Sequence, residues 1–332
     1  MANYDTLLAA DALILCSLIR HSDHSLGQHD RKLTMQKNDQ QDLAALNAAK
    51  HYMGGIAWPT VALGLCVTLA YIITPLLVVN GSLPVLLGLP LMSLLTYAAY
   101  TVLHDAAHGS ITGSHRELRW LNELMGYLAA WVLMIPLTAH RHEHLAHHRN
   151  TNQADDPDLA VADMNKSPLH AARAALRIYA SQYKYYFSHR WSKAPRSQNL
   201  YLCLEIITAI VPRLAFIAAG YWLEALLLFG VAALIGIALL MYLFAYIVHT
   251  PHQSVGRYVD TSTFVVQGTA GKILTMLWGY QNYHSIHHLF PRIPFYMYPD
   301  LFAEIEDIMM AKGAPIYTLG WKGARAQSPV ST

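Results

Sequence analysis

Three short clusters of histidine stand out because their spacing would place several imidazoles on one face of a helix. They read HxxxH, HxxHH and HxxHH, and they comprise His104 and His108, then His144, His147 and His148, and finally His284, His287 and His288. Residues at i, i+3 and i+4 share a helix face, so each cluster can aim two or three nitrogens at one point. Imidazole suits iron, zinc, copper and nickel. Eight nitrogens exceed the three or four that one zinc site usually takes, so the pattern predicts two metal ions in one nest.

The composition indicates that long apolar helices position these clusters. Of the 332 residues, 54% are hydrophobic and only 13% are charged, and the net charge of +2 implies no strongly basic surface for nucleic acid. Soluble domains usually carry about 25% charged residues. The mean hydropathy is +0.25. We therefore expect an all-α, polytopic integral membrane protein. The three cysteines have no metal-ligand spacing and neither need nor suggest disulfides.

Four apolar runs are each long enough to cross a bilayer, which takes about 20 residues. They cover residues 56–79, 83–103, 200–220 and 222–248, and they form two hairpins joined by short turns. A further apolar stretch, residues 124–139, is about 16 residues long, so we expect it to lie in the interface or to re-enter rather than to span. The first histidine cluster follows the second run directly, and the second cluster follows this shorter stretch.

We expect three parts along the chain: a mobile N-terminal tail at 1–50, a catalytic domain at 51–320 and a C-terminal tail at 321–332. The apolar stretch at 7–19 is too short to span a bilayer, and His21, His24 and His29 have no ligand spacing and are expected to be solvated. The basic and aromatic residues within 149–199 favour a membrane-surface segment. A polar helix is expected at about 299–312.

The basic residues predict which ends of the spans face the cytoplasm. All but one of the 23 lysines and arginines lie outside the four runs and outside the two connecting turns. The positive-inside rule then places both termini and the segment 104–199 in the cytoplasm. All three histidine clusters fall at that same face and would form a cytoplasmic cap. The exception, Arg213, is expected to snorkel toward the outer surface.

The clusters and their neighbours resemble the integral-membrane fatty acid desaturase superfamily, which includes desaturase-type carotene hydroxylases. The matching pieces are His-Asp-Ala-Ala-His-Gly at 104–109, Arg-His-Glu-His-Leu-Ala-His-His at 141–148 and Asn-Tyr-His-Ser-Ile-His-His-Leu-Phe-Pro at 282–291. The resemblance covers roughly residues 50–315. It implies a non-haem di-iron centre, O2 as oxidant, and two electrons from an external donor of the ferredoxin, rubredoxin or cytochrome b5 type, since no haem-binding module is fused to the chain.

The resemblance also implies the iron ligands, which are the eight clustered histidines and one more near the end of the fourth run. Either His249 or His252 could serve, and we expect His252, which follows Pro251 where the chain leaves the helix. His140 and His142 do not fit the HxxHH phase. Outer partners that orient the ligands are expected among Asp105, Asp156 and Asn282.

The function implied by the resemblance is oxidation of an unactivated C–H bond in a lipid, which needs cofactor chemistry. We expect a double bond to be introduced into a fatty acyl chain. Hydroxylation of a carotenoid ring or another hydrocarbon stays open, because the two reactions differ only in their second step. A divalent-metal transporter is a more distant alternative. Transporter sites lie near the bilayer midplane, whereas these histidines lie at the ends of the apolar runs, on one side. The lipid could enter sideways past tyrosines near the metal ends of the spans: Tyr97, Tyr100, Tyr242 and Tyr246.

Overall fold

The computed structural model describes residues 28–327, and it divides the chain into two compact units, one ending at Asn47 and the other beginning at Ala48. The expected apolar stretch at 7–19, His21, His24 and the side chain of His29 lie outside the described residues. The described part of the expected N-terminal tail forms helix α2 (Gln28–Lys50). The remaining elements belong to the second unit.

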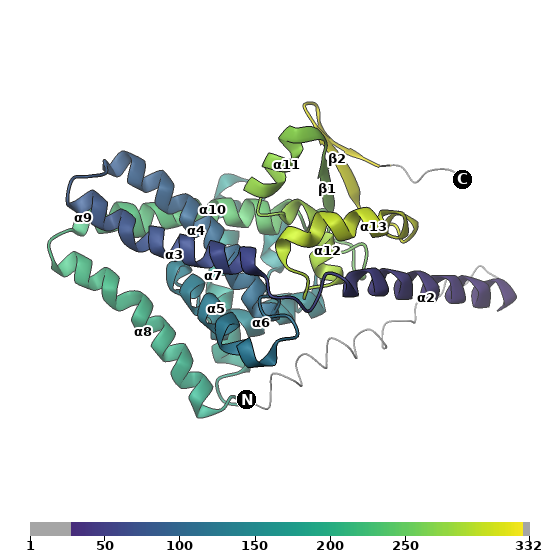
Figure 1. The fold of residues 1–332 in the computed structure, drawn as a ribbon, viewed down its shortest axis with the longest axis horizontal. Helices are drawn as coiled ribbons and strands as arrows, with labels where there is room; N and C mark the ends of the chain where they lie inside the picture. The colour runs from purple at the N-terminus through teal and green to yellow at the C-terminus, as the bar shows by residue number, and fades with distance from the viewer. Residues whose placement is uncertain (1–27, 328–332) are drawn as a thin grey trace. The chain divides into compact units, whose positions relative to one another are not determined.

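Among the described residues, four helical segments are long and apolar enough to cross a membrane, as predicted. They are α3 (Trp58–Val79), α4 (Val85–His108), α8 (Arg196–Ala218) and a fourth segment that runs through α9 (Trp222–Ala225), η3 (Leu226–Val231), α10 (Ala232–Leu240) and η4 (Met241–Tyr246). Helix α4 packs between α3 and α10, whereas α8 packs mainly on α5, α6 and α9 (Figure 1). The expectation of a four-span membrane protein is confirmed.

The stretch expected to re-enter or lie in the interface forms a sharp corner. Helices α5 (Arg119–Leu133) and α6 (Leu137–Asn150) are bent by 95° to each other. Met134 at the corner has a φ of 55°, and Pro136 precedes the first turn of α6, where its missing N–H costs no hydrogen bond. The helix formed by the apolar run therefore ends at this corner. Helix α6, which carries the second histidine cluster, runs in a different direction from α5.

Arg213 does not snorkel, contrary to our expectation. Its side chain is buried, and its guanidinium donates to the hydroxyl of Tyr71 and to the carbonyl oxygens of Trp131 and Val132, at 3.0–3.2 Å. The last carbonyls of a helix lack partners within that helix, so the arginine satisfies the end of α5. The guanidinium carbon also lies 5.1–5.6 Å from the ring centroids of Tyr71, Trp131 and Phe229, whose faces attract a cation.

Shorter elements gather at the histidine end of the spans. In chain order they are η1 (Arg116–Leu118), η2 (Leu159–Asp163), α7 (Pro168–His189), β1 (Thr263–Val266), α11 (Gly268–Leu277), η5 (Gln281–Tyr283), α12 (His284–Leu289), η6 (Phe295–Met297), α13 (Tyr298–Ala311), β2 (Ile316–Gly320) and β3 (Gly323–Ala326). Helix α13 matches the expected polar helix. Within the described residues, β1 pairs with β2 in parallel and β2 pairs with β3 antiparallel, so a small sheet joins an otherwise helical protein. Strand β3 lies inside the expected C-terminal tail.

The apolar core lies where α3, α4, α5 and the fourth span meet, and it includes Tyr71, Met92, Leu103 and Met125. A glycine allows two spans to approach each other closely. A Cβ on Gly236 of α10 would lie 2.6 Å from the backbone oxygen of Ser93 in α4. Such contacts hold α4 firmly, and α4 carries the first histidine cluster at its end.

Candidate metal centre

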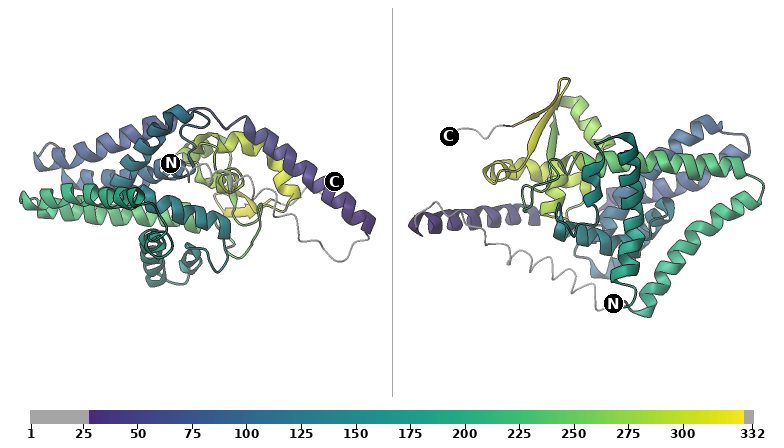
Figure 2. Two further views of the ribbon diagram at one scale, coloured as in Figure 1. Left: turned by 90° about the horizontal axis from the view of Figure 1, so that it is seen from below. Right: turned by 180° about the vertical axis from the view of Figure 1, so that it is seen from behind.

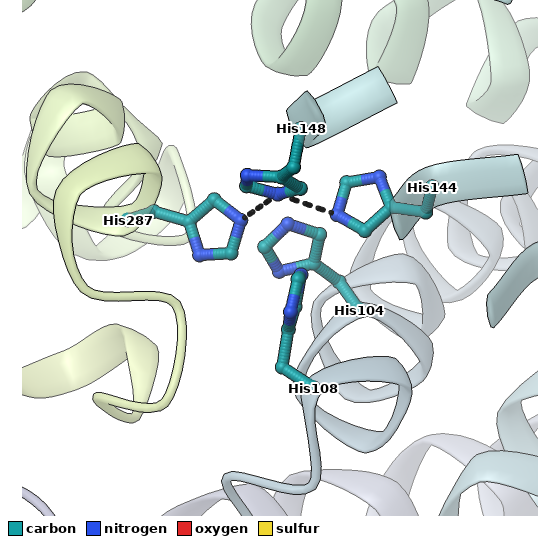
Figure 3. Close-up of side chains that lie close together, drawn as sticks. All are labelled: His104, His108, His144, His148 and His287. Carbon is teal, nitrogen blue, oxygen red and sulfur yellow. Dashed lines mark hydrogen bonds between the residues drawn. The ribbon is translucent and has the colours of Figure 1, made fainter. Parts of the chain in front are cut away.

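The three histidine clusters come together in the folded chain. Within residues 28–327, two groups of imidazoles have nitrogens that all lie within 4.8 Å of one another. One group is His104, His108, His144, His148 and His287, and the other is His147, His249 and His288. Figure 3 shows the rings of the first group pointing into a common space from α4, α6 and the segment that contains α12. Every ring is buried or half-buried.

The end of α4 is fixed so that its two histidines face this space. The helix stops directly after His108 because Gly109 takes a left-handed conformation, with φ of 68°, which is a common helix stop. The carbonyl of Ala106 accepts the backbone N–H of Gly109 at 3.2 Å, and it also accepts hydrogen bonds from the Asn122 amide at 3.0 Å and from the Arg141 guanidinium at 3.1 Å. Both side-chain donors come from the α5–α6 pair, so the first histidine cluster is held beside the second.

Several ligand candidates are oriented by a hydrogen bond on the side of the ring away from the nest. The Nδ1 of His147 lies 2.8 Å from Asp156 Oδ1, and the Nδ1 of His249 lies 2.7 Å from the carbonyl oxygen of Ala245. The Nδ1 of His287 lies 3.1 Å from the Tyr298 hydroxyl. Such outer partners fix the ring orientation and raise the basicity of the inner nitrogen.

The Asp156 carboxylate is itself held in place. It accepts hydrogen bonds from the backbone N–H groups of Asn152 and Asp158, both at 2.9 Å. Burial raises the pKa of this carboxyl, but the neighbouring His147 ring and these donors outweigh the burial, and the net pKa lies below its ordinary value. Asp156 is therefore a charged acceptor for the Nδ1 proton of His147.

The inner nitrogens fit bound cations. The Nδ1 atoms of His147 and His249 both face oxygen acceptors, so both rings turn Nε2 toward the nest, where these two atoms lie only 3.0 Å apart. Two nitrogens at that distance need a proton or a metal ion beside them. Burial lowers the pKa of His147, but the Asp156 carboxylate outweighs the burial and raises this pKa to about 9, so a proton can take the place of a metal ion. Among the described residues, four further histidines of the three clusters have a buried Nε2 with no hydrogen-bond partner, namely His104, His108, His284 and His288, and the same holds for His140 and His252 outside the clusters. Buried polar atoms are rarely left unpaired, and imidazole is a ligand for first-row metals.

A small cavity opens beside the histidines. Its polar wall includes His104, His144 and His249, and its apolar wall comes from the fourth span, through Met241 and Phe244. Of the four tyrosines expected along a lipid path, only Tyr100 lines this cavity within the described chain. The space brings apolar side chains and inner histidine nitrogens to the same site.

A family model described as fatty acid desaturase matches residues 80–320. The chain belongs to this family. The resemblance expected from the histidine clusters is thereby confirmed, and the match contains all three of them.

Curated relatives agree with the family assignment. The fatty acid desaturase of Bacillus subtilis (strain 168) is 26% identical over 222 residues, which cover 59% of this chain and 61% of the relative. The Delta(9) fatty acid conjugase-like enzyme of Dimorphotheca sinuata is 23% identical over 261 residues, or 66% and 68% of the two chains. The sn-1 acyl-lipid omega-3 desaturase (ferredoxin) of Nostoc sp. (strain 36) is 32% identical over 62 residues, or 19% and 16%. The chain thus matches about three-fifths of the length of the Bacillus relative.

In this desaturase-family protein, His249, just past the fourth span, lies in the second histidine group, whereas we expected the ninth ligand to be His252. His249 follows η4 by one turn, and its Nδ1 hydrogen bond to Ala245 turns Nε2 toward His147. His252 lies beyond this helical segment with a φ of 66°, and its ring stacks on Tyr246 at a centroid distance of 5.0 Å. The His252 ring lies in neither histidine group among the described residues.

Two of the expected outer residues lie close by but contact no imidazole among the described hydrogen bonds. Asp105 accepts a hydrogen bond from the Thr60 hydroxyl at 2.9 Å and from the backbone N–H of Phe295, so it ties α4 to α3 and η6. Its position, about 100° around the helix from His104, accounts for this. Asn282 donates to the Phe264 carbonyl oxygen at 2.9 Å and to the Thr275 hydroxyl at 3.0 Å. These two hydrogen bonds hold the residues just before α12 in place.

His140 and His142 stay outside the two groups, in line with their phase. The Nδ1 of His140 lies 2.7 Å from Gln182 Oε1, and His142 Nε2 lies 2.7 Å from Gln198 Nε2. The sequence reading missed the outer partners Ala245 and Tyr298, and also Asp260, whose carboxylate lies 3.8 Å from Nδ1 of His288. Burial raises the pKa of Asp260 to about 7. None of these three residues lies in a histidine motif, so spacing alone gave no signal for them.

Proposed function

We propose that this protein is a membrane-bound, non-haem di-iron enzyme that uses O2 to introduce a double bond into a fatty acyl chain. One observation carries the proposal. Two adjacent groups of inward-facing histidine nitrogens lie at the ends of the spans, in a chain whose family is fatty acid desaturase. The division into two groups supports two ions rather than one, because eight or nine nitrogens exceed the coordination sphere of a single first-row metal.

The histidine groups suggest how the ligands divide between the ions. The first group would hold one iron, and the second group would hold the other. The first consists of His104, His108, His144, His148 and His287, and the second of His147, His249 and His288. His284 would join the second set, because its buried Nε2 lacks a partner in the described chain and its ring lies 4.8 Å from that of His288. We therefore propose His249, and not His252, as the ninth ligand.

The chain itself would position the substrate and keep water away. Bound iron with O2 supplies an oxidant strong enough for an unactivated C–H bond, which acid–base groups cannot attack. Tyr100, Met241 and Phe244 would hold the acyl chain against the inner nitrogens, since they form the cavity wall. These residues belong to α4 and the fourth span, so the acyl chain of the substrate would enter from the bilayer.

We further propose that the centre faces the cytoplasm and receives electrons from a separate protein. The distribution of basic residues supports the orientation. The family supports an external donor, and the Nostoc relative carries ferredoxin in its name. A ferredoxin, rubredoxin or cytochrome b5 type protein would fit this role.

Expression in a host that lacks the reaction tests the proposal. Mass spectrometry of acyl chains from cells with the wild-type gene should reveal a species two hydrogens lighter than its precursor. His287→Ala should abolish that species, whereas His170→Ala, which alters an exposed histidine outside the nest, should not. A product heavier by one oxygen would favour hydroxylation instead. An unchanged lipid profile, at normal protein level and with donor supplied, would contradict an oxidase function.

A further inference from the structure

Helix α7 and the linker after it carry an unbalanced positive charge. Between Asp163 and Glu205 every charged residue is a lysine or an arginine. The first of these cations, Lys166, pairs with Asp163, but Arg173, Arg177 and Lys184 are exposed further along the helix. The segment therefore presents cations with no acidic residue interleaved.

The exposed face of α7 is also apolar. The helix buries Ala174, Ile178, Gln182 and Tyr186, which recur every four residues and pack toward the rest of the protein. On the opposite face, Leu169, Leu176 and Phe187 are 58%, 68% and 48% exposed.

At about 100° per residue, these three apolar side chains fall along one edge of the exposed face, and the three cations fall along the adjacent edge. A split face of this kind is typical of helices that lie in a membrane interface.

The placement of α7 agrees with that position. Figure 2 (right) shows α7 lying across the long helices instead of alongside them. Ile178 packs against Met241 in η4, the last turns of the fourth span. The chain then enters the third span at Arg196, only a few residues after α7 ends at His189. Helix α7 therefore lies where two spans reach their histidine ends, and it runs across the direction of the spans.

We propose that the exposed face of α7 binds the anionic headgroups of the membrane surface. The cationic edge would contact the headgroups, and Leu169, Leu176 and Phe187 would insert among the upper acyl carbons. An acidic soluble protein could also meet the cations, but it would leave this apolar edge without a partner of matching chemistry. The proposal concerns a lipid contact apart from the histidine nest, so it stands independently of the proposed redox function.

Fluorescence quenching in nanodiscs tests the contact with the full-length protein. Ala180→Cys places a label in the middle of the exposed face, in a background where the native cysteines are serine. Quenching by spin-labelled phosphatidylglycerol should exceed quenching by spin-labelled phosphatidylcholine at equal lipid content. Each basic residue near an anionic surface contributes a preference of roughly fivefold, so replacing three should lower the preference at least tenfold.

The test variant is Arg173→Gln/Arg177→Gln/Lys184→Gln. Its matched control, Lys272→Gln/Lys322→Gln/Arg325→Gln, removes the same charge from exposed residues on other elements and should leave the preference unchanged. A second variant, Leu176→Ser/Phe187→Ser, keeps the cations and should reduce quenching by both lipids.

Equal quenching of the wild-type label by the two lipids would overturn the proposal, and this comparison does not depend on any charge variant folding. Absence of quenching by either lipid would overturn it as well. A further outcome would reassign the face to a protein partner. In that case the label would show no lipid preference, but its emission would change when a plant-type ferredoxin is added, and the triple glutamine variant would abolish this change.

Discussion

At the level of single residues, the nitrogens that face out of the nest determine which nitrogens face into it. Asp156 and the carbonyl oxygen of Ala245 each fix an Nδ1 proton, on His147 and His249 respectively. Each imidazole has two nitrogens, so fixing one as donor leaves the other with a lone pair for a metal. The outer partners thus help to determine the candidate centre along with the histidines.

Asp156→Asn should weaken the centre without unfolding the chain. The amide is neutral and no longer stabilises the His147 ring as the carboxylate does, and loss of such a partner costs about 10–100-fold in metal affinity or activity. Titration of the purified protein with Fe(II) under nitrogen would measure the change in affinity. Asp155→Asn, at the exposed neighbouring position, is the control and should bind iron as the wild type does. Equal affinity in the two variants would argue against a role for the Asp156 charge.

His249→Ala should lower the iron content to about half of the wild-type value, because one of the two proposed ions loses a ligand that lies 3.0 Å from His147. His252→Ala should retain normal iron, since its ring stacks on Tyr246 outside both histidine groups. Elemental analysis of both purified variants gives the answer. Full iron in the first and depleted iron in the second would restore His252 as the ligand.

At the level of elements, the corner between α5 and α6 aims the second histidine cluster. Its carbonyl oxygens accept hydrogen bonds from two other helices. The Tyr179 and Tyr183 hydroxyls of α7 both donate to Met134, and Arg213 of α8 donates to Trp131 and Val132. A helix end buried in an apolar region needs such partners, since no water satisfies it.

Gly236→Ala should loosen α10 from α4 and lower the unfolding free energy by about 1–3 kcal/mol, the usual cost of an overpacked core. The new Cβ would lie 2.6 Å from the Ser93 backbone oxygen, which cannot rotate away. Gly230→Ala in the same span is the control, because its Cβ would meet only Leu226 Cδ1 at 3.5 Å, an ordinary contact. Thermal unfolding in detergent, with equal midpoints for the two variants, would contradict tight packing at Gly236.

The sequence predicted those features that show as a helical spacing of residues or as the length of an apolar run. The four spans are long apolar runs, and the histidines of each cluster share a helix face, so both were accessible without a structure. The grouping of His249, and not His252, with the other histidines was not, because it depends on where the chain turns after Thr250. Arg213 was misjudged because its partners lie far away in the chain. The short strands β1 and β3 carry too few residues for a periodic signal.

At the scale of the whole molecule, the four spans should bring all three histidine clusters to the cytoplasmic side of the membrane. A cysteine at Ser82, in the exposed α3–α4 turn, should react with an impermeant thiol reagent applied to intact cells. A cysteine at the exposed Asn165 should react only after permeabilisation. Inverting the hairpins would move many cationic residues across, at about 2.5–3.5 kcal/mol each at mid-membrane. The reverse labelling pattern would contradict the proposed cytoplasmic centre.

The pairing of β1 with β2 has a consequence for how the third histidine cluster is held. β1 precedes this cluster and β2, which begins at Ile316, follows it, so the parallel ladder closes a loop of the chain around His284, His287 and His288. A truncated product ending before β2 would keep its histidines yet lack the strand that secures them.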